Sequence, residues 1–562
     1  MRFRTLSRRI LLILALICPI STFATSQIDD FTQSWQHQAL TLQRQMGHAL
    51  PLGKTNFLTT HNSFNTQHYM SFMRYWDPNQ YLSVAEQLDM GIRALEYDIH
   101  YFWNRFGIQD LLLCHGFNFD SLKHVGCSPF DLTAHNGLLE LETWLRQPQN
   151  QQEVVILYIE DHMDDQYNLM VSLLDNTIGD RIYRPEGCQS LPMDISKNDI
   201  LALGKQVIII GGNCGNTGWS QTAFNYGYPT DNDNFLPYPA CKTANYSTDF
   251  IQNNFTRIYE DKTNLSRLFS TPPQAITPEL MEQATACGLS TIGLDKLTPS
   301  DERLTAAIWS WDNNQPSAYI NQCALLNENN RFTSVQCDNY QPYTCSDSDS
   351  GEWKITSNIG PFSEGQQACE SEFGEFFTFT TPQNGYQQTQ LTQARIDNGY
   401  ASTPWVNYTF ESVHNQWVSN NTPMPTYSAV ISTSSEQLMN GHYFCLSVKN
   451  DDLSEGAIIE QNSCQSNDSQ QWQQDSVGKL QLAAQNTLCI GATRSLRPYR
   501  NMVLVTCNSD QAITWIRGNN NSYRVSQDPS LALGISGAFW GKGRQAKLYR
   551  YSGNKGQQWV SK

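Results

Sequence analysis

Residues 91–98 read Gly-Ile-Arg-Ala-Leu-Glu-Tyr-Asp, and this stretch predicts a strand with two unlike faces. Successive side chains of a strand point in opposite directions, so Ala94, Glu96 and Asp98 share one face. The leucine and tyrosine between them share the other face, which is apolar enough to pack under helices. Two carboxylates therefore point toward the axis or the mouth of a barrel. Close carboxylates repel each other unless a proton or a cation lies between them.

Short apolar runs alternate with helical patterns between residues 50 and 320. The apolar runs are Asn56–Phe64, Arg93–Tyr101, Leu111–His115, Glu153–Glu160, Val207–Ile210, Thr256–Glu260 and Thr291–Leu294. The amphipathic stretches are Leu82–Leu88, Leu138–Leu145, Tyr167–Ile178, Pro278–Ala286 and Asp301–Ile308. This alternation predicts a parallel α/β fold, a (β/α)8 TIM-like barrel. An open doubly wound sheet is the alternative, but no glycine-rich nucleotide loop follows a first strand.

Polar residues end several of these strands, at the rim where a barrel carries its chemistry. They are His61, Asn62, Asp98, His115 and Glu160. With Glu96, the set holds three carboxylates and an amide oxygen, which suits Ca²⁺, and the lack of a His-rich or thiolate set argues against zinc. Two histidines can divide the proton transfers of phosphodiester cleavage. Each residue alone has a structural alternative, such as core packing, helix capping or pairing with Arg93.

Four motifs carry these residues: His61-Asn-Ser-Phe64, Arg93–Asp98, Cys114-His-Gly116 and Val154–His162. In this order they resemble the X region of the phosphatidylinositol-specific phospholipase C superfamily, over about residues 55–165. The resemblance implies that His61 is the general base and His115 the general acid. It implies that calcium is held by Asn62, Glu96, Asp98 and Glu160.

Two positions separate the calcium type from the metal-independent bacterial members of this superfamily. Those members carry Arg where Asp98 stands and Asp where Asn62 stands, so this chain resembles the calcium type. The signalling enzymes hold ring phosphates with lysines near the strand that here runs Val207–Gly212, which has no charged residue. Plain phosphatidylinositol or another phosphodiester is therefore the expected substrate. The candidates for the headgroup pocket are Arg93, Arg257, Glu260 and Trp311, each with core packing or an ion pair as the alternative.

Residues 436–562 contain an internal repeat. Its units end in Gln470-Gln-Trp472, Ile513-Thr-Trp515 and Gln557-Gln-Trp559, with cysteines in matching places in the first two units. Three such units resemble the ricin-type β-trefoil lectin, a fold in which one unit alone cannot bury its apolar face. The resemblance makes glycans candidate partners. Against this, Ser447, Gly491 and Gly534 stand where sugar-binding repeats usually carry Asp, so a structural or targeting trefoil is the alternative.

The remaining segments complete four predicted regions. Residues 1–24 predict a secretory signal peptide, with four arginines before an apolar run too short for a membrane anchor. Residues 25–324 are the predicted barrel. Residues 325–435 predict a small β-rich module, faintly similar to C-type lectins or else a linker. Residues 436–562 are the trefoil.

Composition agrees with an exported protein. There are 15 cysteines, and the 14 that remain without Cys18 are an even number, as disulfides require. A net charge of −16 argues against nucleic acid as a partner.

The sequence thus predicts a secreted, calcium-dependent phosphodiesterase that acts on a phosphatidylinositol-like lipid at a membrane surface and releases diacylglycerol. The alternatives are a glycerophosphodiester phosphodiesterase and a catalytically weak glycan-binding adhesin. The first usually begins with a His-Arg-Gly motif that is absent here.

Overall fold

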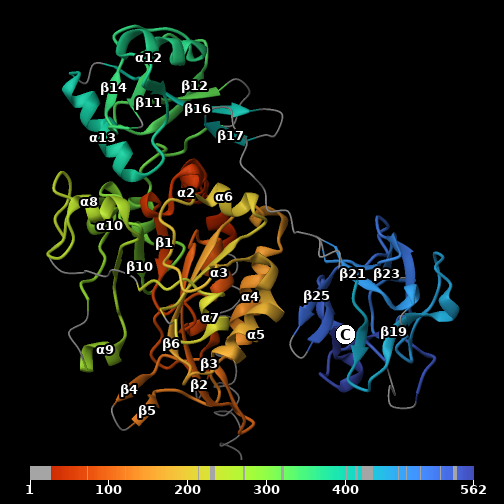
Figure 1. The fold of residues 1–562 in the computed structure, drawn as a ribbon. Coiled ribbons are helices and arrows are strands. Elements are labelled where there is room, and N and C mark those ends of the chain that lie inside the picture. Colours follow the sequence, from red (N-terminus) through yellow and green to blue (C-terminus); the bar gives the residue numbers. More distant parts are fainter. Residues whose placement is uncertain are drawn as a thin grey trace, which may run out of the picture. The chain divides into compact units, whose positions relative to one another are not determined.

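The structure is a computed structural model (Figure 1). It describes residues 27–71, 74–119, 122–212, 214–227, 235–269, 273–317, 322–347, 349–399, 402–411, 416–419, 435–465, 467–475, 478–493, 495–518, 521–535 and 541–561. The predicted signal peptide lies outside the described residues. The chain forms two compact units. The first consists of Met1–Leu132, Val154–Asn168 and Tyr183–Thr426, and the second consists of Thr133–Glu153, Leu169–Ile182 and Tyr427–Lys562.

A curled parallel sheet forms the centre of the N-terminal region. Its strands run in the order β7-β8-β6-β2-β1-β10-β9, with β3 added beside β2. Their bounds are β1 Phe57–Thr60, β2 Ala94–Trp103, β3 Gln109–Leu113, β6 Val155–His162, β7 Ile182–Tyr183, β8 Val207–Ile210, β9 Arg257–Tyr259 and β10 Thr291–Leu294. The prediction of a parallel α/β sheet is confirmed.

The predicted closure into a (β/α)8 barrel is not confirmed. Among the described residues, β7 and β9 end the sheet, and no pairing joins them. One predicted parallel strand also runs the other way, since β3 pairs antiparallel with β2. The five residues between them are too few for the crossover that a parallel neighbour needs, so the chain turns back as a hairpin. A second hairpin, β4 (Phe117–Phe119) and β5 (Leu122–Val125), follows.

Helices connect the strands. They are α2 Trp35–Met46, α3 Val84–Asp89, α4 Ala134–Leu145, α5 Tyr167–Ile178, α6 Lys197–Ala202, α7 Thr217–Ser220, α8 Thr248–Asn253, α9 Asn264–Phe269, α10 Pro278–Ala286 and α11 Glu302–Ala306. Local sequence fixes their starts: Ser83 and Glu86 form a capping box before α3, and Thr277 caps α10, which begins with Pro278. Among the described residues, every helix is too short or too polar to cross a membrane.

The middle module mixes strands with helices, so the predicted β-rich composition is incomplete. Two antiparallel sheets have the orders β12-β11-β16-β17 and β14-β13-β15. The elements are β11 Gln322–Leu326, β12 Phe332–Gln336, β13 Thr344–Asp347, β14 Trp353–Ile355, α12 Gly365–Phe373, β15 Phe377–Phe379, α13 Gly385–Asp397, β16 Trp405–Glu411 and β17 Gln416–Ser419. The module contacts the first region directly, because the Asn384 amide donates to the carbonyl of Lys54 at 2.8 Å.

The C-terminal region contains three small antiparallel sheets around one apolar core, as the repeat predicts. Its strands are β18 Leu438–Asn440, β19 Cys445–Val448, β20 Ile459–Asn462, β21 Trp472–Gln474, β22 Leu480–Leu482, β23 Gln485–Ala492, β24 Met502–Thr506, β25 Trp515–Gly518, β26 Ser522–Val525, β27 Asp528–Gly534, β28 Arg544–Gln545, β29 Lys547–Arg550 and β30 Trp559–Ser561. The repeated tryptophans are buried. The indole N–H of Trp472 donates to Leu446 and that of Trp559 to Leu533, in each case 26 residues earlier.

The 14 cysteines of the described part of the chain are all in disulfides, as their even number predicts. The seven pairs are 114–127, 188–214, 241–287, 323–337, 345–369, 445–464 and 489–507. Each pair closes within one region of the sequence, and the last two lie in matching places of successive trefoil repeats.

Candidate active site

Three carboxylates meet at the carboxyl ends of β2 and β6. Asp98 and Glu160 are register partners across the two parallel strands, and Glu96 lies two residues before Asp98 on the same face. One oxygen from each lies within 4.8 Å of one from each of the others. Tyr97 points away and packs edge-on against Phe64, as strand alternation requires.

The charges in this cluster change its proton affinities. Burial, followed by the neighbouring carboxylates of Glu160 and Glu96, raises the pKa of Asp98 well above its usual value. Glu160 behaves differently. Burial acts to raise its pKa, but the hydrogen bond from His162 (3.1 Å) and the charge of that ring outweigh burial and lower it. Of these two carboxylates, Asp98 is therefore the one that needs a proton or a cation to offset its negative charge.

Asn62 faces the same cluster. Its backbone is in the left-handed region, with φ of 46°, which asparagine tolerates better than most residues. In the orientation that satisfies both neighbours, the amide nitrogen donates to the two Asp98 oxygens at 2.8 and 3.0 Å, and the amide oxygen accepts from His61 at 3.3 Å. The opposite orientation would place the amide oxygen beside the Asp98 carboxylate, which is the arrangement that shared coordination of a cation requires.

His61 is nearly enclosed by polar and aromatic groups. Its Nδ1 lies 3.4 Å from an oxygen of Asp295 and 3.3 Å from the amide nitrogen of Asn79. The ring of Tyr259 lies 4.9 Å away, centroid to centroid. Burial acts to lower the pKa of His61, but the charges of Asp295 and Glu96 together outweigh burial and raise it to about 9. Asp295 is therefore placed to orient this imidazole and to stabilise its protonated form.

Two asparagines connect His61 to His115. The Asn65 amide nitrogen lies 3.3 Å from His115 Nδ1 and donates to the Asn79 side-chain oxygen at 2.7 Å. The Asn79 nitrogen in turn faces His61 and donates to Asp295 at 2.8 Å. Burial, then the charge of His61, lowers the pKa of His115. The two imidazoles thus lie at opposite ends of one bridge and have opposite pKa shifts.

Arg257 supplies a fixed positive charge beside the carboxylates. Its two terminal nitrogens donate to the two oxygens of Glu96, at 3.1 and 2.6 Å. The guanidinium also lies 4.4 Å from the ring centroid of Tyr259, two residues further along β9. A bidentate pair of this kind holds both partners rigidly. Of the four residues predicted for the headgroup pocket, Arg257 is the one that reaches the carboxylate cluster.

The other three predicted pocket residues lie elsewhere. Arg93 is buried and donates to the carbonyls of Leu88 and Ile92. Glu260 is also buried, pairs with Arg303 and accepts from the backbone of Asp295. Trp311 packs on Phe332, Tyr408 and Trp417 of the middle module. Core packing or an ion pair, and not a place in a headgroup pocket, therefore accounts for these three side chains.

Several site residues were missed by sequence reasoning. They are Asn65, Asn79, Tyr259, Asp261 and Asp295. Asp295 directly follows β10, which pairs with β1. The pairing extends past the strand ends, because the backbone N–H of His61 donates to the carbonyl of Leu294, the residue before Asp295, at 3.2 Å. Asp295 could have been predicted as a site residue because it is an acidic residue directly after a predicted parallel strand.

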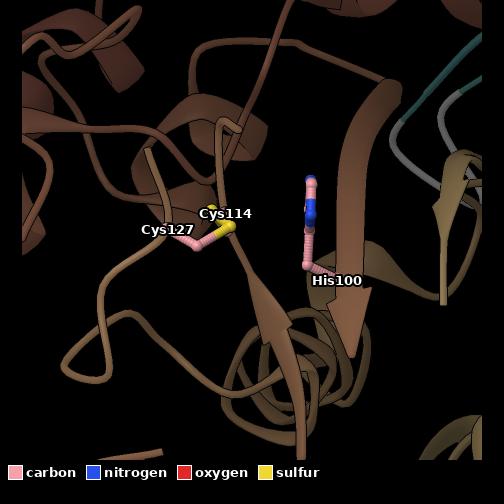
Figure 2. Close-up of side chains that lie close together, drawn as sticks. All are labelled: His100, Cys114 and Cys127. Carbon is pink, nitrogen blue, oxygen red and sulfur yellow. A yellow bond between two sulfur atoms is a disulfide. The ribbon is translucent and has the colours of Figure 1, made fainter. Parts of the chain in front are cut away.

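Two further groups have metal-like spacing. His61, Asp261 and Asp295 belong to the hydrogen-bonded site above. His100 lies beside Cys114 and Cys127, which Figure 2 shows joined by a disulfide. Sulfurs in a disulfide are not thiolate ligands, so this group is no metal site as it stands. A cavity of about 370 Å³ adjoins His115 and is lined in part by Asn65, Trp76 and Asp131.

The fold and the site together define a class: an α/β protein whose strand ends gather a carboxylate cluster and two histidines, as phosphodiesterases do. A model of the Rv2075c PI-PLC-like domain matches residues 17–301, and a model of the ricin-type β-trefoil lectin domain matches residues 434–559. The chain belongs to the Rv2075c PI-PLC-like family and ends in a ricin-type trefoil. A phosphodiesterase-type function follows in general terms.

The family includes two Mycobacterium tuberculosis proteins, MT2135 of strain CDC 1551 and Rv2075c of strain H37Rv, both named as uncharacterized. Each is 33% identical over 406 residues, which are 68% of this chain and 81% of the relative. Among solved structures, the C-half of the earthworm R-type lectin in complex with GalNAc is 14% identical, covering 23% of this chain and 97% of that one with a TM-score of 0.20. The designed protein ThreeFoil is 24% identical, covering 23% and 96%, with a TM-score of 0.21.

Proposed function

We propose that this chain is an exported, calcium-dependent phosphodiesterase that cleaves the glycerol–phosphate bond of phosphatidylinositol or a related phospholipid. The observation that carries the proposal is the cluster of Glu96, Asp98 and Glu160 beside two bridged imidazoles. Such a cluster needs positive charge that the described side chains supply only in part, through Arg257 at Glu96.

The donor set fits calcium. The three carboxylates and the Asn62 amide are hard oxygen donors, and the burial-raised pKa of Asp98 marks the position where a cation would replace a proton. Bound calcium would offset the charge that builds on the phosphoryl oxygens. Because Arg257 neutralises Glu96, the metal site would rest mainly on Asp98, Glu160 and Asn62.

The histidines would divide the proton transfers. His61 would take the proton of the attacking hydroxyl, and the Asp295 carboxylate would stabilise the imidazolium that forms, as in other carboxylate–histidine pairs. His115 would protonate the leaving glycerol oxygen. Without a cation, the raised pKa of His61 and the lowered pKa of His115 oppose these roles. A cation held by Asp98 and Glu160 would add positive charge near His61 and so lower the pKa of this imidazole.

Where the hydroxyl is vicinal to the phosphate, its oxygen would attack phosphorus, the bond to the diacylglycerol oxygen would break, and a cyclic phosphate would form. Arg257 and Tyr259 lie together on one face of β9, where an inositol ring could pack against the tyrosine. This placement supports a headgroup pocket beside Glu96.

Exposed apolar side chains support a lipid substrate. They lie at the end of β2, in the loops after β1, β2 and β5, and on α9. They are Met70, Trp76, Trp103, Phe106, Ile108, Phe130 and Leu268. Large exposed apolar side chains at the mouth of a site favour contact with a membrane surface. The trefoil supports glycans as further partners, through its lectin family alone.

The test is a substrate screen with the exported form of the chain. Phosphatidylinositol, glycosylated phosphatidylinositol, phosphatidylcholine and glycerophosphodiesters are each supplied with calcium or with chelator. We expect calcium-dependent release of diacylglycerol, lost in His61→Ala and in His115→Ala and kept in His442→Ala of the trefoil. Turnover of glycerophosphodiesters alone would favour that alternative class, and no turnover of any substrate would favour the adhesin.

A further inference from the structure

The cavity of about 370 Å³ lies at the His115 end of the active site. Both His115 and Asn65 line it, whereas His61 lies at the other end of the asparagine bridge. In the proposed function, His115 protonates the leaving oxygen, so the group bonded to that oxygen would face this cavity. The other half of the substrate would lie at the opposite end of the bridge, where His61 and Tyr259 are in contact.

Three segments far apart in the sequence form the walls of the cavity: the loop after β1, the loop after β5, and α9. The Tyr75 hydroxyl donates to the carbonyl of Leu113 at 2.7 Å and accepts from the backbone N–H of Leu132 at 3.2 Å. Asp77 accepts from the backbone N–H of Leu265, in the first turn of α9, at 2.8 Å. Hydrogen bonds within the protein therefore hold the walls in place, as in pre-formed binding pockets.

The wall beside His115 is also fixed covalently. Cys127 lines the cavity and forms a disulfide with Cys114, the residue directly before His115 (Figure 2). The loop after β5 is thereby tied to the segment that carries the proposed general acid. A ligand held by this wall would therefore have a defined position relative to the His115 imidazole.

Most of the lining is apolar, with one guanidinium among it. Trp76, Pro129 and Leu265 contribute apolar surface. Arg74 also lines the cavity, and its Nε donates to the backbone carbonyl of Tyr69 at 2.7 Å, which fixes the side chain. A guanidinium donates hydrogen bonds and accepts none. Arg74 therefore suits a ligand with an oxygen acceptor between apolar groups.

Asp131 adds a second donor to the lining. The residue is 8% exposed, and its Oδ2 accepts from the backbone N–H of Ser128 at 2.7 Å. Burial raises the pKa of this carboxyl to about 7, although the Ser128 N–H and the charge of Arg74 act to lower it. Near neutral pH the carboxyl is therefore protonated in a large share of the molecules, and a protonated carboxyl donates a hydrogen bond. The carbonyl oxygen of an ester is a matching neutral acceptor.

The volume of the cavity limits what it can hold. At about 30 Å³ for a water-sized group, 370 Å³ corresponds to roughly a dozen non-hydrogen atoms. Glycerol together with two ester groups has about this many, whereas two long acyl chains have several times more. The chains would therefore leave the cavity past Trp76, which lines it and is 71% exposed.

We propose that this cavity is the leaving-group subsite and that it binds the acylated glycerol of the substrate, with Arg74 and Asp131 donating to ester carbonyls. The inference rests on the proposed function, because it assigns the leaving side of the same reaction. It also narrows the substrate class to phosphodiesters whose leaving alcohol is an acylated glycerol and not free glycerol. A site that hydrogen-bonds and encloses the ester groups should favour such a substrate by about tenfold or more.

The first test measures binding and needs no turnover. Dibutyrylglycerol and free glycerol are each titrated into the full chain and followed by ligand-observed NMR. We expect dibutyrylglycerol to bind about tenfold or more tightly than glycerol, and Leu265→Trp, which fills the cavity, to remove this preference. Leu203→Trp is the matched control, since Leu203 is an exposed leucine at the end of α6. Equal binding of the two probes by the wild type, or an unchanged preference in Leu265→Trp, would overturn the subsite.

If Leu265→Trp does not fold, Trp76→Ala decides, because this exposed side chain forms part of the wall. Weaker binding of dibutyrylglycerol in Trp76→Ala supports the subsite, and unchanged binding refutes it.

The second test separates this inference from the proposed function. KM and kcat are measured for dihexanoyl phosphatidylinositol and for glycerophosphoinositol, both as monomers in solution. Leu265→Trp should raise KM for the first substrate and leave KM for the second unchanged. Turnover without this difference refutes the subsite alone. Binding of dibutyrylglycerol without turnover of any phosphodiester refutes the proposed function and leaves a cavity that binds acylated glycerol.

Discussion

Asp98→Asn should have opposite effects on stability with and without calcium. In the metal-free protein, the substitution removes a buried carboxylate that faces two others within 4.8 Å. Two unit charges at such a distance interact with about 3.5 kcal/mol at an effective dielectric constant near 20. Arg257 offsets the contribution of Glu96, and partial protonation of Asp98 offsets some of the rest. We therefore expect the free energy of unfolding in chelator to rise by roughly 2–3 kcal/mol.

With calcium the order reverses. An ion at about 1,000 times its Kd stabilises the wild type by about 4.1 kcal/mol, and the variant should lose most of this increment. The assay is urea unfolding at fixed pH, in chelator and in excess calcium. Asp165→Asn is the matched control, since Asp165 is an exposed carboxylate beyond the end of β6 with φ of 62°, which asparagine tolerates. If Asp98→Asn is less stable in chelator, or keeps the full calcium increment, the carboxylate cluster is not a metal site.

Three further substitutions test the rest of the site. Asn65→Leu breaks the bridge between the histidines and should lower kcat about 10–100-fold with KM nearly unchanged, because positioning and not binding is lost. An increase in KM as large as the decrease in kcat would contradict this role. Tyr259→Leu should mainly raise KM for phosphatidylinositol, measured against Tyr443→Leu on the exposed trefoil surface, and an unchanged KM would remove the tyrosine from the headgroup pocket. Burial raises the pKa of Asp131 from 3.8 to about 7, so stability from this group is complete below pH 3.8 and is lost as pH rises to 7. Measured by urea unfolding, the free energy of unfolding should fall by about 2.6 kcal/mol between pH 5 and pH 8, and Asp131→Asn should remove this fall. The same fall in both proteins would refute the assignment.

The sheet was predictable where strands are short and apolar. Val207–Ile210 and Thr291–Leu294 are strands with the predicted bounds, because β-branched and apolar runs of this length between turn residues have few alternatives. The direction of β3 was predicted incorrectly, since an apolar run alone does not report which way the chain travels. Loop length does: the five residues after β2 allow a hairpin and forbid a crossover.

The carboxylate cluster was predictable because it depends on strand alternation and on register between parallel neighbours. The partners of His61 were not. Asp295 lies 234 residues away, and its approach depends on β1 pairing with β10 at one particular register. Asn65 and Asn79 come from an irregular loop after β1, where no periodicity assigns side chains to a face. Sequence patterns therefore identify the site residues that lie on strands and miss the loop residues that orient them.

Strand alternation places more polar side chains on the shared face of β2 and β6 than the motifs alone indicate. Glu96, Asp98 and His100 occupy alternate positions of one strand, as do Glu160 and His162 of its neighbour. Because parallel register keeps equal steps opposite each other, Asp98 lies opposite Glu160 and His100 lies opposite His162. The contact of His124 with His100 could not be predicted in this way, because a hairpin and not strand alternation brings His124 across. One pleated face therefore carries carboxylates on two successive rungs of β2 and imidazoles on the next.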